Sequence, residues 1–344
     1  MRASSPLIVL TVVAAAAASI GAQSQEGFRF RSGVDLVNVT ATVTDDDGRF
    51  VSGLRREDFS VYEDGKLQDV SYFNNDRVPV SLGILLDASG SMTPDKMSAA
   101  RSAIDRLIYD LLDKDDELFF MEFATRASLV QHWTTDRRLI SRAVKDVDPT
   151  GVTAIYDAIA TAIPTAQAGA HRKKALLVIS DGNDTNSSTP VGVLRQQIRE
   201  SEVLVYALGI DGSDRRSIDV VRPTPPVQIP FPVPFPFPGG RRPDPRMPPI
   251  GGGSGGGTWP SAPGDRVNAD ALRQITDDTG GRTEIVRGSG GLGSATARIA
   301  DELSKQYYLG YTSEVERDGR WHSIRVAVRD RRLTVRARRG YVAS

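Results

Sequence analysis

The residues of this chain that are best suited to chemistry lie in the segment 87–91, Asp-Ala-Ser-Gly-Ser. An apolar run over residues 80–86 precedes it, and such a run is typical of a buried strand. In open α/β sheets, ligands bind at the carboxyl ends of the strands. The carboxylate of Asp87 and the hydroxyls of Ser89 and Ser91 therefore suit a hard cation such as Mg²⁺, which prefers oxygen ligands in octahedral geometry.

Two further segments place oxygen-bearing side chains at the ends of predicted elements. Thr153 follows Gly-Val and opens a helical pattern in which isoleucines repeat every fourth residue on one face. A second apolar run, residues 175–180, predicts another buried strand, and Asp181 follows it directly. Serine and aspartate also cap helices that follow buried strands, so each segment alone has a purely structural interpretation.

In this order, the three segments resemble the metal-ion-dependent adhesion site of von Willebrand factor A (VWFA) domains. The resemblance implies a doubly wound, mostly parallel α/β sheet of the Rossmann-like kind, with helices on both faces. It also implies one open coordination position for an acidic group of a partner. The resemblance implies a divalent cation, Mg²⁺ or else Mn²⁺ or Ca²⁺. This sequence has a matching residue at each position that would hold it: Asp87, Ser89, Ser91, Thr153 and Asp181.

The patterning on both sides of this α/β region is that of strands. Residues 33–44 alternate in the manner of a half-buried strand, and Asp64-Gly65 is the turn signal of a hairpin between residues 59–62 and 68–73. Beyond residue 306 the alternation returns.

Because each flank is too small to be stable alone, we expect the two to form one sandwich-like all-β domain. Residues 28–79 and 306–341 would supply its six or seven strands, and the α/β domain, residues 80–305, would be inserted between them. The flanks are also similar to the VWFA-related family of secreted bacterial proteins, common in acidobacteria. That resemblance rests on residues 51–54, 57–59, 61–65, 307–311 and 339–341.

The first residues have the form of a secretory signal. Arg2 is followed by an apolar core over residues 7–18, and residues 19–22 offer small side chains for cleavage. The alternative is a retained membrane helix, but the run is shorter than the ~20 apolar residues that span a bilayer. We therefore expect residues 1–22 to be a cleaved signal peptide and the mature chain to be secreted or periplasmic, with no transmembrane segment.

Charge and cysteine content exclude some classes of protein. Lys+Arg and Asp+Glu both number 43, and a net charge of zero argues against a nucleic-acid binder that neutralises phosphates. The chain has no cysteine, which excludes disulfides and a lipid-anchored cysteine.

A proline-rich insert over residues 222–265 interrupts the α/β pattern. Its Phe-Pro run predicts polyproline II or disordered chain, and residues 251–257 form a glycine tether. The strand before the insert, which ends at Ile210, is expected beside the strand that carries Asp181. We expect the insert to leave the sheet on the metal side and to gate or extend the binding surface. The alternative is a loop without effect, since long inserts cost little stability.

Other candidate chemistry is weaker. The G-x-S-x-G pattern at residues 252–256 lies in the glycine tether, with no strand before it. His132, His171 and His322 share no metal spacing, so we expect each at the surface or in packing. The arginine-rich last thirty residues have two interpretations, attraction to anionic envelope polymers or solvated strand faces.

These observations predict a secreted, non-enzymatic module for protein binding or cell adhesion. Its metal would coordinate a carboxylate of a protein or envelope polymer, and no base or nucleophile is expected beside the site. The alternative is a structural or assembly component of the cell envelope whose metal only holds loops together.

Overall fold

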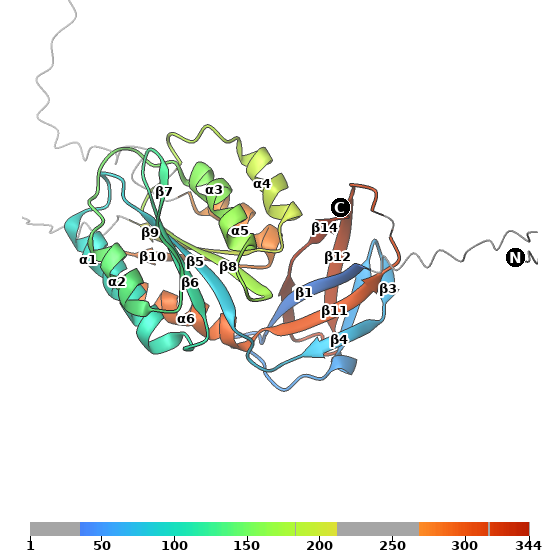
Figure 1. The fold of residues 1–344 in the computed structure, drawn as a ribbon. Helices are drawn as coiled ribbons and strands as arrows, with labels where there is room; N and C mark the ends of the chain where they lie inside the picture. The colour runs from blue at the N-terminus through green and yellow to red at the C-terminus, as the bar shows by residue number, and fades with distance from the viewer. Residues whose placement is uncertain (1–34, 183, 212–267, 316, 344) are drawn as a thin grey trace, which may run out of the picture. The chain divides into compact units, whose positions relative to one another are not determined.

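The computed structural model describes residues 35–182, 184–211, 268–315 and 317–343 (Figure 1). The predicted signal peptide, residues 1–22, and the proline-rich insert, residues 222–265, lie outside the described residues. Among the described helices, none is long and apolar enough to cross a membrane.

The α/β region is built on a six-stranded sheet. Its strand order is β10-β9-β8-β5-β6-β7, and all neighbours are parallel except β6 and β7. The strands are β5 (Val80–Asp87), β6 (Glu117–Phe123), β7 (Ala127–Thr134), β8 (Lys173–Ser180), β9 (Leu204–Asp211) and β10 (Thr283–Arg287).

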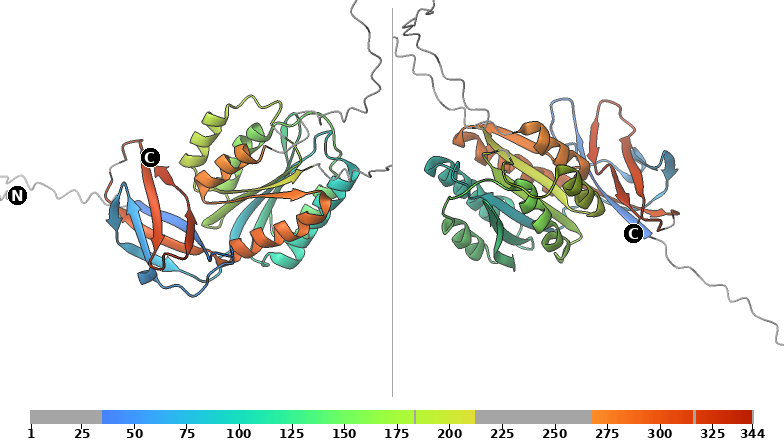
Figure 2. Two further views of the ribbon diagram at one scale, coloured as in Figure 1. Left: turned by 180° about the vertical axis from the view of Figure 1, so that it is seen from behind. Right: turned by 90° about the horizontal axis from the view of Figure 1, so that it is seen from above.

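Helices cover both faces of this sheet, as the two views of Figure 2 show. One apolar core packs α1, α2 and α6 against the sheet, and a second packs α3, α4 and α5 against the other face. The expected doubly wound α/β class is therefore confirmed. The helices are α1 (Pro94–Arg106), α2 (Arg137–Lys145), α3 (Ile155–Gln167), α4 (Val191–Glu200), α5 (Ala269–Thr279) and α6 (Leu292–Lys305).

Strand β5 is buried along its whole length because it lies in the middle of the sheet. Successive side chains point to opposite faces, so Leu86 joins the core under α1 and Leu85 joins the core under α3. Gly83 is required here because a Cβ atom at that position would lie 2.2 Å from Cζ of Phe119.

The flanking segments form two antiparallel four-stranded sheets, with strand orders β13-β1-β11-β4 and β14-β12-β2-β3. Each sheet joins strands from before and after the α/β region: β1 pairs with β11 and β13, and β2 pairs with β12. The strands are β1 (Asp35–Thr44), β2 (Phe59–Glu63), β3 (Lys66–Gln68), β4 (Val70–Asn74), β11 (Tyr307–Ser313), β12 (Trp321–Val328), β13 (Thr334–Ala337) and β14 (Gly340–Val342).

One expected strand is in fact two. Residues 68–73 were expected to be a single hairpin strand, but the chain changes sheets at Asp69. Gln68 pairs with Val61 in one sheet, whereas Val70 pairs with Tyr311 in the other. Alternation of side chains indicates which face is buried but not which neighbour a strand pairs with, so the pattern did not reveal the change.

A buried polar network joins helix α6 to the flanking strands. The carboxylate of Glu302 accepts hydrogen bonds from Thr42 Oγ1 and Tyr206 OH, both at 3.1 Å, and pairs with Arg336. Burial raises the pKa of Tyr206 well above its usual value. The side-chain amide of Gln306 donates to Thr42 Oγ1 and to Tyr206 OH. The network therefore ties β1 and β13 to β9 and α6.

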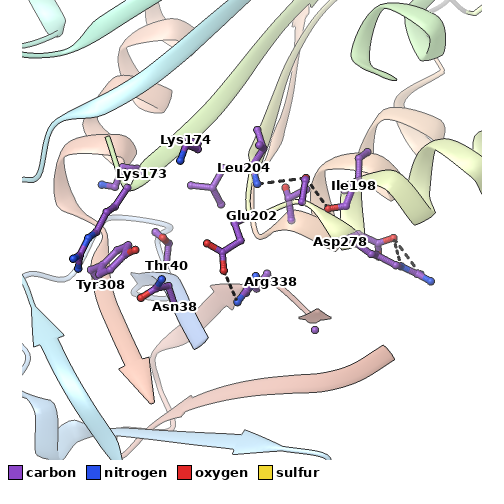
Figure 3. A pocket seen from close by; sticks show the side chains of 16 residues that line it. Asn38, Thr40, Lys173, Lys174, Ile198, Glu202, Leu204, Asp278, Tyr308 and Arg338 are labelled. Carbon is purple, nitrogen blue, oxygen red and sulfur yellow. Dashed lines mark hydrogen bonds and ion pairs between the residues drawn. The ribbon is translucent and has the colours of Figure 1, made fainter. Parts of the chain in front are cut away.

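A cavity of about 20 Å³ lies between strands of the α/β region and the flanking strands (Figure 3). Lys173, Lys174 and Glu202 line it from one side, and Asn38 and Arg338 from the other. A nitrogen of Arg338 lies 3.3 Å from a carboxylate oxygen of Glu202 across it. A volume of this size holds about one water molecule.

Candidate functional site

The candidate site lies where the order of the sheet reverses. From β5 the chain continues to β6 on one side, and later returns to β8 on the other side. The carboxyl ends of two such strands form a crevice in which α/β proteins bind ligands. Asp87 is the last residue of β5, and Asp181 directly follows β8. The sheet therefore brings these two carboxylates to the same crevice.

The hydroxyls of Ser89 and Ser91 are joined by hydrogen bonds to the carboxylate of Asp181, Ser91 directly and Ser89 through Ser91. Ser89 Oγ and Ser91 Oγ are 2.9 Å apart, and Ser91 Oγ donates to Oδ1 of Asp181 at 2.7 Å. Ser89 and Asp181 are buried, whereas Ser91 is exposed at the mouth of the crevice. The sequence-predicted residues Ser89, Ser91 and Asp181 are thus linked in a row, with Ser91 hydrogen-bonded to both of the others.

Thr153 lies at the same crevice, in the loop before α3. Its carbonyl accepts hydrogen bonds from the backbone N–H groups of Thr185, at 2.9 Å, and Asn186, at 3.1 Å, in the loop after β8. A Cβ atom placed on Gly182 would lie 3.3 Å from Thr153 Oγ1 and 3.8 Å from Ser91 Oγ. Both hydroxyls therefore converge on the backbone that follows Asp181.

Asp87 lies beneath the hydroxyls and is completely buried. Its Oδ1 accepts from the backbone N–H of Ser89 at 2.8 Å, and its Oδ2 accepts from Ser180 Oγ at 2.5 Å. Burial raises the pKa of Asp87 to about 6, although the hydrogen bonds from Ser180 and Ser89 oppose this shift. Asp87 therefore holds the loop that carries Ser89 and Ser91 in place through a buried hydrogen bond.

Backbone hydrogen bonds hold the surrounding loops to one another. Gly90 N donates to Gly151 O at 3.0 Å, and Thr150 N donates to Ala88 O at 2.6 Å. These bonds join the loop after β5 to the loop before α3, so the oxygen-bearing side chains are positioned in advance of any ligand.

Sequence reasoning missed Lys96, which contributes a cation to the site. Its Nζ lies 2.5 Å from Oδ2 of Asp181 and donates to the carbonyl of Ser91 at 3.3 Å. Lys96 is the third residue of α1, whose N-cap is Thr93. The first turn of a helix favours acidic side chains, so a lysine there was a signal that could have been noticed. Ser180, the hydrogen-bond donor to Asp87, was also missed.

The donor set suits a hard divalent cation. Hydroxyl and carboxylate oxygens are the ligands that Mg²⁺, Mn²⁺ and Ca²⁺ take, and the oxygens of Ser89, Ser91 and Asp181 already lie together. Among the described residues, no group of three or more His, Cys, Asp or Glu side chains could hold a metal. A site here would therefore depend on the hydroxyls.

Residues 82–183, which include all five sequence-predicted ligands, match the family described as von Willebrand factor type A domain. The chain contains a von Willebrand factor type A domain. The matched segment runs from β5 to the loop after β8, so it covers both strands whose ends form the crevice.

Several solved structures are similar to this protein. The conserved hypothetical protein BatB from Bacteroides thetaiotaomicron is 23% identical, with 66% of this chain and 98% of that chain covered and a TM-score of 0.44. A von Willebrand factor type A protein from Catenulispora acidiphila is 15% identical, with coverage of 89% and 73% and a TM-score of 0.45. Proximal thread matrix protein 1 from the mussel byssus, with a zinc-occupied MIDAS motif, is 13% identical, with coverage of 70% and 49% and a TM-score of 0.46. No curated protein matches the sequence.

Two of the other sequence candidates have structural partners away from the A-domain crevice. The ring of His322 lies between Asp64, 2.7 Å from Nδ1, and Asp318, 3.2 Å from Nε2. His171 Nε2 is 2.9 Å from the carbonyl of Asp115. The G-x-S-x-G pattern at residues 252–256 lies outside the described residues.

Several of the C-terminal arginines form ion pairs with acidic side chains of the α/β region. Arg336 pairs with Glu302, and Arg339 lies 3.5 Å from Asp277. The positive charge of this pair of arginines is thus partly neutralised within the molecule.

Proposed function

We propose that this protein is a secreted or periplasmic binding module that holds a divalent cation, Mg²⁺ or else Mn²⁺ or Ca²⁺, and uses it to bind an acidic partner. The residues that would hold the ion are Asp87, Ser89, Ser91, Thr153 and Asp181. The observation that carries the proposal is the convergence of Ser89, Ser91 and Asp181 at the reversal point of the sheet.

The five residues would have different roles in holding the ion, because they lie at different depths in the crevice. Ser91 is exposed at the mouth of the crevice, whereas Thr153 is buried and its hydroxyl lies near the backbone of Gly182. Asp181 accepts a hydrogen bond from Ser91 Oγ. Both oxygens of Asp87 already accept protein hydrogen bonds, so Asp87 would orient Ser89 or act through bound water. A bound divalent cation would supply an open coordination position for a carboxylate oxygen of a protein or envelope polymer.

The proposal can be tested by titrating Mn²⁺ and Mg²⁺ into the full chain in a calorimeter. Ser91→Ala removes one of the proposed ligand oxygens. We expect it to weaken metal binding by about tenfold or more, since even the loss of a group that only orients a ligand costs about ten- to a hundredfold in metal affinity. Ser98→Ala is the matched control, because Ser98 is exposed on α1 away from the crevice. Equal affinity in wild type and Ser91→Ala would count against the site.

A chelator distinguishes this function from a purely structural metal. We expect EDTA to abolish capture of partners from an envelope extract while the far-UV circular dichroism and the thermal midpoint change little. If EDTA instead unfolds the A domain, the metal holds the fold together and the structural alternative is favoured.

A further inference from the structure

Lys96 and a divalent cation would require the same carboxylate. The ammonium of Lys96 lies 2.5 Å from Asp181 Oδ2, and the side chain of Asp181 is completely buried. The other oxygen, Oδ1, accepts the hydrogen bond from Ser91. Within the described residues, Lys96 is the one basic side chain in an ion pair with Asp181.

A buried carboxylate is costly unless a cation or several hydrogen bonds compensate it. Lys96 provides that compensation for Asp181, and it does so from a position that it can leave. Its side chain is 20% exposed, it emerges from the first turn of α1, and the flexible four-carbon stem of lysine allows the ammonium to reach solvent. The positive end of the α1 dipole also repels an ammonium there.

We propose that Lys96 is a built-in competitor of the metal: binding of a divalent cation is an exchange in which the ammonium leaves Asp181 and the cation replaces it. This inference rests on the proposed function, because it concerns the same site. The charge on Asp181 is compensated in both states. The exchange sets the concentration of cation above which the site can bind an acidic partner.

The exchange also alters the mouth of the crevice. An ammonium that leaves Asp181 remains tethered to α1, beside the exposed Ser91. It then offers a second positive charge to the carboxylate that the cation attracts. Lys96 would thus oppose the metal while paired with Asp181 and assist partner binding once released.

The first test compares the affinity of wild type and Lys96→Met for Mn²⁺ by calorimetry, at one pH and one ionic strength. Removal of the competing charge should tighten Mn²⁺ binding by roughly tenfold, because charges a few ångströms apart interact strongly at a partly buried site. Lys145→Met removes the same charge from an exposed position on α2 and should leave the affinity unchanged.

The thermal midpoint in EDTA provides a second readout that involves no metal. Lys96→Met leaves the buried Asp181 without its cation, so its midpoint in EDTA should fall below those of wild type and Lys145→Met. Addition of Mn²⁺ should then raise the midpoint more in Lys96→Met than in wild type, because the metal restores the missing charge.

A third measurement uses the unmodified protein and remains informative if Lys96→Met does not fold. Acetic anhydride modifies free amines, and mass spectrometry locates the modified lysines. We expect saturating Mn²⁺ to increase the rate of acetylation at Lys96 several-fold and to leave the rate at Lys145 unchanged.

The outcomes separate this inference from the proposed function. If neither wild type nor Lys96→Met binds Mn²⁺, the proposed function fails and the exchange fails with it. If wild type binds Mn²⁺ but Lys96→Met binds it equally or more weakly, or if Mn²⁺ does not expose Lys96 to acetylation, the exchange alone is overturned. Binding by Lys96→Met that is tighter than that of wild type supports both.

Discussion

Asp87 shows how one buried carboxylate can organise a site without facing its mouth. It lies at the end of a central strand, and both of its oxygens accept hydrogen bonds from protein groups. Its loss would leave the N–H of Ser89 and the hydroxyl of Ser180 without their acceptor. Removal of Asp87 should therefore affect the loop and the proposed metal together.

We predict that Asp87→Ala weakens Mn²⁺ binding in calorimetry and lowers the free energy of unfolding by about 1–3 kcal/mol, the cost of unsatisfied buried groups. The sheet itself should remain folded in far-UV circular dichroism. Asp146→Ala, at an exposed position after α2, is the control and should change neither quantity. A folded Asp87→Ala protein with wild-type Mn²⁺ affinity would remove Asp87 from the site.

His322, on strand β12, should give the flanking sheets a pH-dependent stability. Burial disfavours the charged ring, but hydrogen bonds to Asp64 and Asp318 outweigh it and raise the pKa of His322. The bond from His322 in turn lowers the pKa of Asp64, and the backbone N–H of Arg320 does most to lower that of Asp318. The ring of Tyr341 also packs against His322.

The signs of these shifts define a pH window. A raised histidine pKa stabilises the fold below its unfolded pKa, and this stabilisation is lost as pH rises through the folded value. The lowered aspartate pKa values stabilise above the unfolded carboxyl pKa and are lost as pH falls through the folded values. Stability from this cluster should thus be greatest at mildly acidic pH.

We predict that the free energy of unfolding of wild type falls between about pH 5.5 and about pH 8.5 more than that of His322→Gln does. Urea unfolding at both pH values measures the difference. His132→Gln is the control, because His132 lies on β7 in the A domain, and it should keep the wild-type dependence. Parallel profiles for wild type and His322→Gln would refute the assignment.

At the scale of residues, the sequence predicted which side chains would lie near one another at the crevice but not all of their hydrogen-bond and ion-pair partners. Asp87, Ser89, Ser91, Thr153 and Asp181 could be named because they lie at the ends of strongly patterned elements and because these segments together resemble the adhesion site of VWFA domains. The role of Lys96 could not be, since it depends on which way a long side chain turns from the first turn of a helix. That these residues bind metal remains a prediction.

At the scale of elements, strand β5 positions the site because it is packed on both faces. Gly83 leaves the space that Phe119 fills, and a Cβ atom there would also lie 2.7 Å from Cδ2 of Leu176. Any larger residue would push β5 away from its neighbours β6 and β8. The end of the strand, and Asp87 with it, would move.

We predict that Gly83→Ala destabilises the protein by about 1–3 kcal/mol, the usual cost of overpacking a core. Gly192→Ala on α4 is the matched control. A Cβ atom at Gly192 meets nothing within 4 Å, and alanine is favoured over glycine in helices by about 1 kcal/mol, so this change should be neutral or stabilising. Urea unfolding of both variants measures the contrast, and equal stabilities would contradict the packing argument.

The fold class could be predicted because periodicity distinguishes strands from helices and the two regions differ in period. Finer features could not. The change of sheet at Asp69 leaves the alternation unbroken, and the π-helical turn Leu107–Leu111 after α1 has the same apolar face as an ordinary helix. Both depend on contacts with distant parts of the chain, which local patterns do not record.

At the scale of the whole molecule, Glu302 links the α/β region to the flanking strands. It lies on α6 with no exposed side-chain surface, accepts from Thr42 of β1, and pairs with Arg336 of β13. The removal of one member of a buried ion pair leaves the other uncompensated. Loss of Glu302 should therefore destabilise both regions.

We predict that Glu302→Ala lowers the free energy of unfolding by about 3–5 kcal/mol, in line with other broken buried pairs. Asp301→Ala is the control on the same helix. Asp301 is half-exposed, and its partner Lys305 lies one helical turn further along α6. Loss of this solvent-accessible pair should cost only about 0.5 kcal/mol. Similar effects of the two variants in denaturant unfolding would show that the Glu302 network is not a structural link.

The register of strands β4 and β11 has a consequence for what the chain between them can be. Asn74, at the end of β4, pairs with Tyr308, near the start of β11, so the intervening A domain occupies the place of a hairpin turn. A longer connection between paired strands costs little additional closure entropy, so the flanking sheets need not change their strand pairing to accept one. The two residues at which the intervening region begins and ends therefore lie side by side. A unit of a different length or sequence could be joined at the same two residues while the flanking sheets keep their strand register.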